Sequence, residues 1–178
     1  MHILLFLHSI RKIRERILEM EYENYGKIIG VIEDIVRGED CCSQMISVQT
    51  ENGPVNLIVA GDTQVIGNMK LRRGMRIAAF YDTNLATPAI YPPQYRATLV
   101  TSLRRGQNVV LQYFDRDLTA QDQSLRLNVG PKTTVTTANG QNYPCNPSNQ
   151  VLLVYYTTTT FSIPPMTTPE KIIVMCPK

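Results

Sequence analysis

The sequence predicts an all-β protein made of two tandem small β-barrels related by an internal duplication, with one amphipathic helix at the N-terminus. Three observations support this fold class. From Tyr25 onward, short β-rich runs alternate with turn residues about every eight to twelve positions. The order of these runs is repeated in the second half, and the residues before them have helical spacing instead. With 178 residues, 43% of them hydrophobic, the chain is long enough to bury a core.

Residues 1–23 are predicted to form the N-terminal helix. Its apolar residues recur at spacings of three and four, which places them on one face: Ile3, Phe6, Ile10, Ile13, Ile17 and Met20. Basic residues follow the apolar start at positions 11, 12, 14 and 16. Three interpretations remain open. The helix packs on its own domain or on a partner chain, it lies on a membrane surface, or Met20 is the true start of translation.

Neither export nor a membrane span is expected. The apolar run at 3–7 is shorter than the roughly seven to fifteen residues of a secretory hydrophobic region, and the basic residues come after it. No stretch approaches the roughly 20 apolar residues that a membrane-spanning helix needs. We therefore expect a cytoplasmic protein with reduced thiols and no transmembrane segment.

The first barrel unit is expected over residues 24–103. Its predicted strands are the six β-rich runs 26–36, 43–50, 54–60, 63–67, 75–82 and 95–103. Polar and apolar residues alternate along 45–50, as in a strand with one buried face. Asn52-Gly53 is the strongest short-range signal for a hairpin turn.

The second unit, residues 104–178, repeats four sequence signals in the same order. Residues 57–65 match 127–135, 74–81 match 149–156, 90–93 match 162–165, and 98–100 match 172–174. We therefore expect Val65 to superpose on Val135 and Ile77 on Leu152. Closing each small sheet into a barrel would remove its exposed edges, as in the five-stranded oligonucleotide-binding (OB) barrel. The sequence does not separate an OB-like barrel from another small barrel.

The Pro-Pro pair of the first unit is the predicted contact surface of a non-catalytic binding module. The candidate residues are Tyr91, Pro92, Pro93, Tyr95 and Arg96. Two prolines fix the backbone between the tyrosines, and Tyr and Arg are enriched at binding hot spots. The second unit keeps the prolines without the tyrosines. The alternative is that both tyrosines close the end of the barrel as part of its core.

The second candidate function is binding of single-stranded nucleic acid by OB-type barrels. Such a site needs aromatic rings beside cations, and Arg72, Arg73, Arg76 and Tyr81 are the candidates. The net charge argues against it, because residues 26–100 contain seven basic and seven acidic residues. Nucleic acid is therefore a possible partner that the sequence does not favour.

No enzyme, cofactor or metal is expected. Both histidines, His2 and His8, lie in the N-terminal segment, so no catalytic Ser–His or Cys–His pairing is expected. The four cysteines contain no CxxC pair, which argues against a zinc site. Asp115 and Asp117 are two apart but are expected to be solvated. Self-association through the N-terminal helix remains possible.

The run from Tyr81 to Ala97 reads YDTNLATPAIYPPQYRA. It resembles a family of small proteins from Gram-positive anaerobic bacteria that share a YDxNxxxPxIYPPQYRA core and a repeated OB-like β-barrel unit. The resemblance covers about Tyr22 to Cys176 and departs from the family's proline-spaced version at residues 85–87. It implies a compact bacterial β protein with no assigned activity and carries over no site residue.

Overall fold

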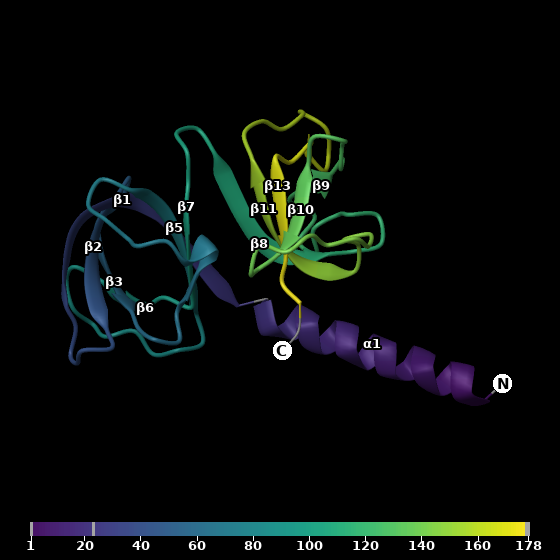
Figure 1. Cartoon of the computed structure of the whole chain (residues 1–178), viewed down its shortest axis with the longest axis horizontal. Helices are drawn as coiled ribbons and strands as arrows, with labels where there is room; N and C mark the ends of the chain where they lie inside the picture. The colour runs from purple at the N-terminus through teal and green to yellow at the C-terminus, as the bar shows by residue number, and fades with distance from the viewer. Residues whose placement is uncertain (1, 23, 177–178) are drawn as a thin grey trace. The chain divides into compact units, whose positions relative to one another are not determined.

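The computed structural model describes residues 2–22 and 24–176, which form one α-helix, one short 3-10 helix and thirteen strands (Figure 1). The chain divides into two compact units. One is Asn24–Arg105, and the other is Gly106–Lys178 together with Met1–Glu23. The prediction of a mostly β protein with one N-terminal helix is confirmed.

The unit 24–105 contains a single seven-stranded sheet with the order β4-β7-β5-β1-β2-β3-β6. The strands and one 3-10 helix are β1 (Tyr25–Arg37), β2 (Gln44–Thr50), β3 (Gly53–Val59), β4 (Gln64–Val65), η1 (Ile66–Asn68), β5 (Arg76–Asp82), β6 (Gln94–Arg96) and β7 (Leu99–Ser102).

The long strand β1 joins the two halves of this sheet by changing partners midway. Its first half pairs with β5 up to Val31, its second half pairs with β2 from Val31 onward, and a β-bulge follows Ile32. Bulges bend a strand and increase its twist. Gly30 lies at the change of partner, where a Cβ atom would come within 2.3 Å of the carbonyl oxygen of Gln49. Glycine is therefore required for the close approach of β1 and β2.

The predicted closed barrel is not observed, because no ladder joins the two sheet edges β4 and β6 within the described residues. β6 pairs in parallel with β3, whereas β7 pairs antiparallel with β5. Between them, Ala97 donates its N–H to Ile58 and Thr98 donates to Phe80, each at 2.8–2.9 Å. Within two residues the backbone thus changes its hydrogen-bond partner from β3 to β5, and this interrupts the ladder where a barrel would close.

The unit 106–178 contains a four-stranded sheet, β10-β13-β11-β8, and a two-stranded sheet, β12-β9. The strands are β8 (Asn108–Phe114), β9 (Arg126–Leu127), β10 (Thr134–Thr137), β11 (Gln150–Tyr156), β12 (Met166–Thr167) and β13 (Lys171–Val174). Helix α1 (His2–Tyr22) contacts β8 and β11 of this unit. This sheet also remains open, so the second predicted barrel is corrected in the same way.

The two units pair their strands in the same order. β4∥β7 corresponds to β10∥β13, β7–β5 to β13–β11, β5–β1 to β11–β8, and β3∥β6 to β9∥β12. Among the described residues, β2 has no strand counterpart. Two isolated bridges, Phe114 to Ala120 and Thr119 to Arg126, stand in its place.

Val65 and Val135, and likewise Ile77 and Leu152, occupy matching ladder positions, as predicted. The predicted match of 98–100 with 172–174 is wrong by two residues, because Val100 occupies the ladder position of Ile172. The corresponding pairs are Val65–Val100 with Val135–Ile172, and Ile77–Ser102 with Leu152–Val174. Length differences between the units therefore lie in the connections, and the register of the strands is the same.

Each unit has its own apolar core. The first is formed by Ile28, Ile32, Ile46, Val48, Leu57, Ile77, Ala79, Ala97 and Val100. The second is formed by Phe114, Ala120, Leu125, Leu127, Leu152, Val154, Ile172 and Val174. The mostly β-branched and aliphatic composition of both cores suits strands with one face buried.

Helix α1 does not bury the described part of its predicted apolar face. Ile3, Phe6, Ile10 and Ile13 are between 46% and 75% exposed. The side chains of Ile17 and Met20, also assigned to that face, lie outside the described residues. Among the helices that the structure describes, none combines the length and the apolar content that crossing a bilayer requires.

A threonine at the start of each parallel strand pair makes the same two hydrogen bonds. Thr63 Oγ1 accepts from the N–H of Ala60 at 3.0 Å and donates to the carbonyl of Ala97 at 2.8 Å. Thr133 Oγ1 makes the equivalent bonds at 3.2 Å and 2.7 Å. Each hydroxyl ties the turn before the first strand to the segment that precedes the second.

We expect Thr63→Val and Thr133→Val to lower the free energy of unfolding by similar amounts, about 1–2 kcal/mol each, because each leaves two backbone groups unpaired. Thr159→Val, at an exposed loop position, is the matched control and should change stability by less than about 0.5 kcal/mol. Urea unfolding of the three variants measures the differences. A cost confined to one of the two units would contradict the structural equivalence of the threonines.

Candidate functional site

The first Pro-Pro loop connects β5 to β6 and contains no charged residue from position 83 to 93. Both ends of the loop are fixed to the sheet. Thr83 donates its N–H and its hydroxyl to the carbonyl of Asn24, both at 2.7 Å, and Asn56 donates its N–H to the carbonyl of Pro93 at 2.9 Å. The loop is therefore a defined projection from the sheet, with Pro92 and Pro93 limiting its backbone freedom.

Tyr91 and Tyr95 occupy different environments. Tyr91 is 81% exposed, and its hydroxyl lies near Gly53 in the β2–β3 turn. Tyr95 is half-buried in β6, packs against the core of its unit, and stacks on Tyr81 with ring centroids 4.2 Å apart and planes tilted by 32°. The core role expected as the alternative for both tyrosines thus fits Tyr95 and not Tyr91.

The Tyr81–Tyr95 pair lines a hollow of about 290 Å³ beneath the loop. Its lining is apolar along the loop and polar at the sheet; the residues are Tyr81, Asp82, Leu85, Ala86, Thr87, Pro88, Gln94, Tyr95 and Arg96. A pocket with aromatic walls and a few polar groups is typical of a site for a small or extended ligand.

Arg96 lines a second hollow as well, of about 350 Å³, at the turn between β1 and β2. Its Nη2 atom lies 2.9 Å and 3.2 Å from the two carboxylate oxygens of Asp62. Both side chains are more than half exposed, so the ion pair adds little stability. The pair orients the guanidinium between the two hollows.

The pKa of the Tyr81 hydroxyl is raised. Burial is the main cause, and the neighbouring Tyr95 adds to it through its charge when ionised and through a hydrogen bond. Tyr81 therefore remains a neutral stacking partner across the physiological range of pH.

The second Pro-Pro loop also presents apolar side chains, which the sequence analysis missed. Phe161 and Ile163 are fully exposed. Hydrogen bonds within the loop hold it in shape, including Ser162 Oγ to the carbonyl of Pro164 at 2.9 Å and Met166 N–H to Thr160 Oγ1 at 3.0 Å. The available signal was the pair of isolated apolar residues in a run of Thr and Ser directly before the prolines.

The four residues proposed for nucleic-acid contact do not share one surface. Arg73 pairs with Asp34 at 3.1 Å and donates to the carbonyl of Glu33, and Arg76 donates to the carbonyl of Arg104. Arg72 is exposed in the same turn. Tyr81 lies five residues after Arg76 in β5. At this separation the two residues are roughly 16 Å apart and point to opposite faces of the strand.

Of the two closely spaced carboxylates Asp115 and Asp117, Asp115 stabilises the local turn by hydrogen bonds. One oxygen of Asp115 accepts the N–H groups of Asp117 at 2.8 Å and Thr119 at 2.9 Å, which fixes the turn after β8. Within the described residues, no cluster of His, Cys, Asp and Glu has the geometry to hold a metal ion.

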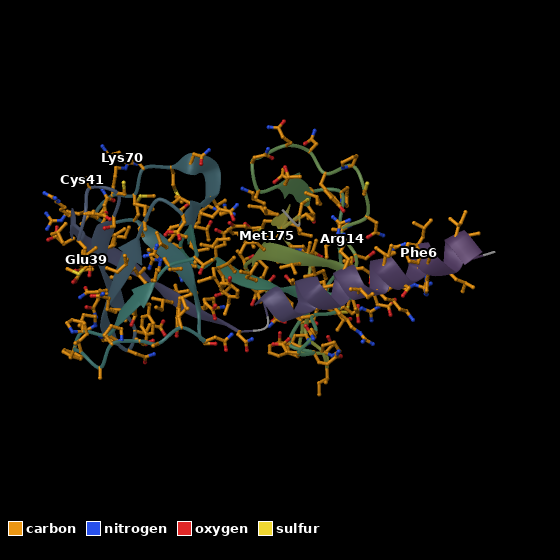
Figure 2. All side chains as sticks on the ribbon, turned by 90° about the horizontal axis from the view of Figure 1, so that it is seen from below. Phe6, Arg14, Glu39, Cys41, Lys70 and Met175 are labelled. Atoms are coloured by element: carbon orange, nitrogen blue, oxygen red, sulfur yellow. The ribbon has the colours of Figure 1, made fainter. Side chains whose placement is uncertain are left out.

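All four cysteines are exposed thiols rather than buried ones: Cys41, Cys42, Cys145 and Cys176. Cys41 lies in the turn between β1 and β2, close in sequence to Glu39 (Figure 2). Cys42 lines the second hollow.

Comparison of the chain with models of known protein families and with curated proteins finds no match to either.

We expect Tyr91→Ala to change the free energy of unfolding by less than about 0.5 kcal/mol, because its ring is exposed. Tyr95→Ala should cost about 2 kcal/mol or more, since it removes a ring that packs on the core and on Tyr81. Denaturant unfolding of both variants measures the difference. Equal costs would contradict the separate environments of the two tyrosines.

The raised pKa of Tyr81 predicts a loss of stability at alkaline pH. A pKa that is higher in the folded than in the unfolded state stabilises the fold below the unfolded pKa of about 10, and this contribution disappears as the pH rises through the folded pKa. Tyr81→Phe should therefore reduce the fall in unfolding free energy measured by urea titration between about pH 9 and pH 11. Tyr91→Phe, which removes an exposed hydroxyl, is the control. An equally steep fall in Tyr81→Phe would contradict the assignment.

Proposed function

We propose that the chain is a non-catalytic binding module whose contact surface is the first Pro-Pro loop, with Tyr91, Pro92, Pro93, Tyr95 and Arg96 as its central residues. The observation that carries the proposal is the exposure of Tyr91, at 81%, on a loop that is anchored at both ends. Because this aromatic ring does not pack in the core, a role in binding a partner is the function that its position favours.

The partner class that fits this surface is an extended segment of another protein. The loop has no charge, its tip is aromatic, and the hollow beside it has two stacked tyrosines and apolar walls. Tyr91 would contact the segment's surface, and the hollow would accept one apolar or aromatic side chain. Prolines limit the freedom of the free loop, which lowers the entropy lost on binding. Four exposed thiols suit a reducing compartment such as the cytoplasm.

Single-stranded nucleic acid is the second candidate, and one arrangement favours it. The Tyr81–Tyr95 stack lies beside Arg96, and bases stack on aromatic rings near cations. If β6 and β7 count as one interrupted strand, the order β1-β2-β3-β6/β7-β5 returns to β1, as a partly open OB-like barrel would. The likeness to an OB barrel is part of this proposal.

We also infer that the two units arose by duplication of one ancestral unit. Three observations support this inference. The strands pair in the same order in both units, and equivalent threonines make the same hydrogen bonds. Val65 also has the ladder position of Val135, and Ile77 has that of Leu152. Under this history the loops are where the two copies diverged, which is also where the proposed contact surface lies.

A displayed peptide library selected on the whole chain tests the first candidate. Enriched peptides are expected to bind Tyr91→Ala at least roughly 30-fold more weakly, as the loss of an aromatic hot spot does. The matched control Phe161→Ala removes a fully exposed ring from the other loop and should leave affinity unchanged. Peptides that bind Tyr91→Ala as well as the unaltered chain would overturn the proposal.

The same chain is then titrated with a labelled oligothymidine of about 20 nucleotides at low and at physiological salt. The peptide-binding proposal expects no specific complex. Tight binding that weakens with salt and that is lost in Arg96→Gln would support the nucleic-acid candidate instead.

A further inference from the structure

The exposed end of helix α1 is apolar on every side. Residues Ile3, Leu4, Leu5, Phe6 and Leu7 are consecutive and are all at least 59% exposed. Consecutive helical residues are rotated by about 100°, so five of them cover the whole circumference. Ile10 and Ile13 extend the exposed apolar surface by two more turns.

The charges that follow are all positive until residue 15. Residues 1–14 contain no Asp or Glu, and the basic residues are Arg11, Lys12, Arg14 and Arg16. Lys12, Arg14 and Arg16 are exposed. Figure 2 shows Phe6 near the N-terminal end of the helix and Arg14 further along it. The helix therefore has an apolar end at residues 3–7, then the polar pair His8 and Ser9, and a cationic section that begins at Arg11.

This pattern distinguishes between two ways of covering the helix. A second copy of the chain packed as a coiled coil covers one stripe of about two residues in seven and leaves the others in water. That arrangement would not cover Leu4 and Leu5, which lie on other sides of the helix from Ile3 and Phe6. A helix that is apolar all round is covered by a surrounding medium, as in a bilayer.

The dimensions and charge fit one leaflet of an anionic membrane. The helix from Ile3 to Ile10 is about 10 Å long. The hydrocarbon region of one leaflet is about 15 Å deep, so it can hold this length. Insertion to that depth places residues 11–16 at the level of the headgroups, where Lys and Arg extend their charges to anionic phosphates.

We propose that helix α1 inserts its apolar end into one leaflet of an anionic lipid bilayer, with Lys12, Arg14 and Arg16 contacting the headgroups. The helix thereby attaches the chain to the membrane surface without crossing it. This role is independent of the proposed function of the Pro-Pro loop.

The absence of Trp from the chain provides a direct test, because a single introduced Trp has no background. Phe6→Trp in the full chain is mixed with vesicles of phosphatidylcholine containing about one-third phosphatidylglycerol, and its emission is expected to shift to the blue. Brominated acyl chains should quench it. Phe161→Trp, a second exposed Phe outside the helix, is the matched control and should show neither effect.

The charge requirement is tested with a double variant. Lys12→Gln with Arg14→Gln should lower the vesicle partition coefficient roughly 20- to 30-fold at low salt, from about fivefold per cation near an anionic surface. Lys70→Gln with Arg72→Gln makes the same change in net charge at exposed positions of the other unit and should leave partition nearly unchanged. Vesicles of phosphatidylcholine alone should bind much less.

Three results would overturn the proposal. The first is an unshifted Phe6→Trp emission with anionic vesicles. The second is a shift that depends on protein concentration without vesicles and accompanies a dimer in analytical ultracentrifugation, which would assign the helix to self-association. The third is equal loss of partition in the two double variants.

Discussion

The change of partner along β1 is the constraint on which the unit 24–105 depends. One strand pairs with β5 over its first half and with β2 over its second, and the backbone of Gln49 comes close enough at Gly30 to exclude a side chain. The bend at this position turns β2 and β3 over the same core that β5 and β7 cover from the other side. Parallel pairing of β3 with β6 then sets the position from which the Pro-Pro loop projects.

The two units show how one pairing scheme supports different surfaces. The ladders that do not involve β2 are paired in the same order in both units, and an equivalent threonine joins the same two segments in each. The side chains before the prolines differ, with Tyr91 in one loop and Phe161 and Ile163 in the other, and all three are exposed. Strand register is determined by core packing, whereas these three exposed side chains do not pack in the core.

The sequence predicted the features that depend on local pattern and failed where a single contact decides. Alternation along 45–50 and the Asn52-Gly53 turn predicted β2 and the β2–β3 hairpin correctly. Closure into barrels was expected because a small open sheet has exposed edges, yet the turn of the backbone at Ala97 and Thr98 interrupts the ladder. No pattern of residue types signals such a turn, since it follows from which carbonyl each N–H meets.

For the candidate site, the sequence located the loop but not the environment of each ring. Tyr91 and Tyr95 are equivalent by composition, and only the pairing of β6 with β3 shows that one ring faces the core. The tip of the second loop contains no tyrosine, and residue type alone does not show that Phe161 and Ile163 are exposed and not part of the core.

The anchoring of each Pro-Pro loop has an evolutionary consequence. Proline restricts the backbone locally, and hydrogen bonds to the sheet hold the loop ends, so the tip side chains contribute little to folding. Substitutions at the tip then have little effect on stability, so natural selection acts on them only through their effect on binding. A duplicated unit with such a loop can acquire a new specificity by single substitutions, without passing through unstable intermediates.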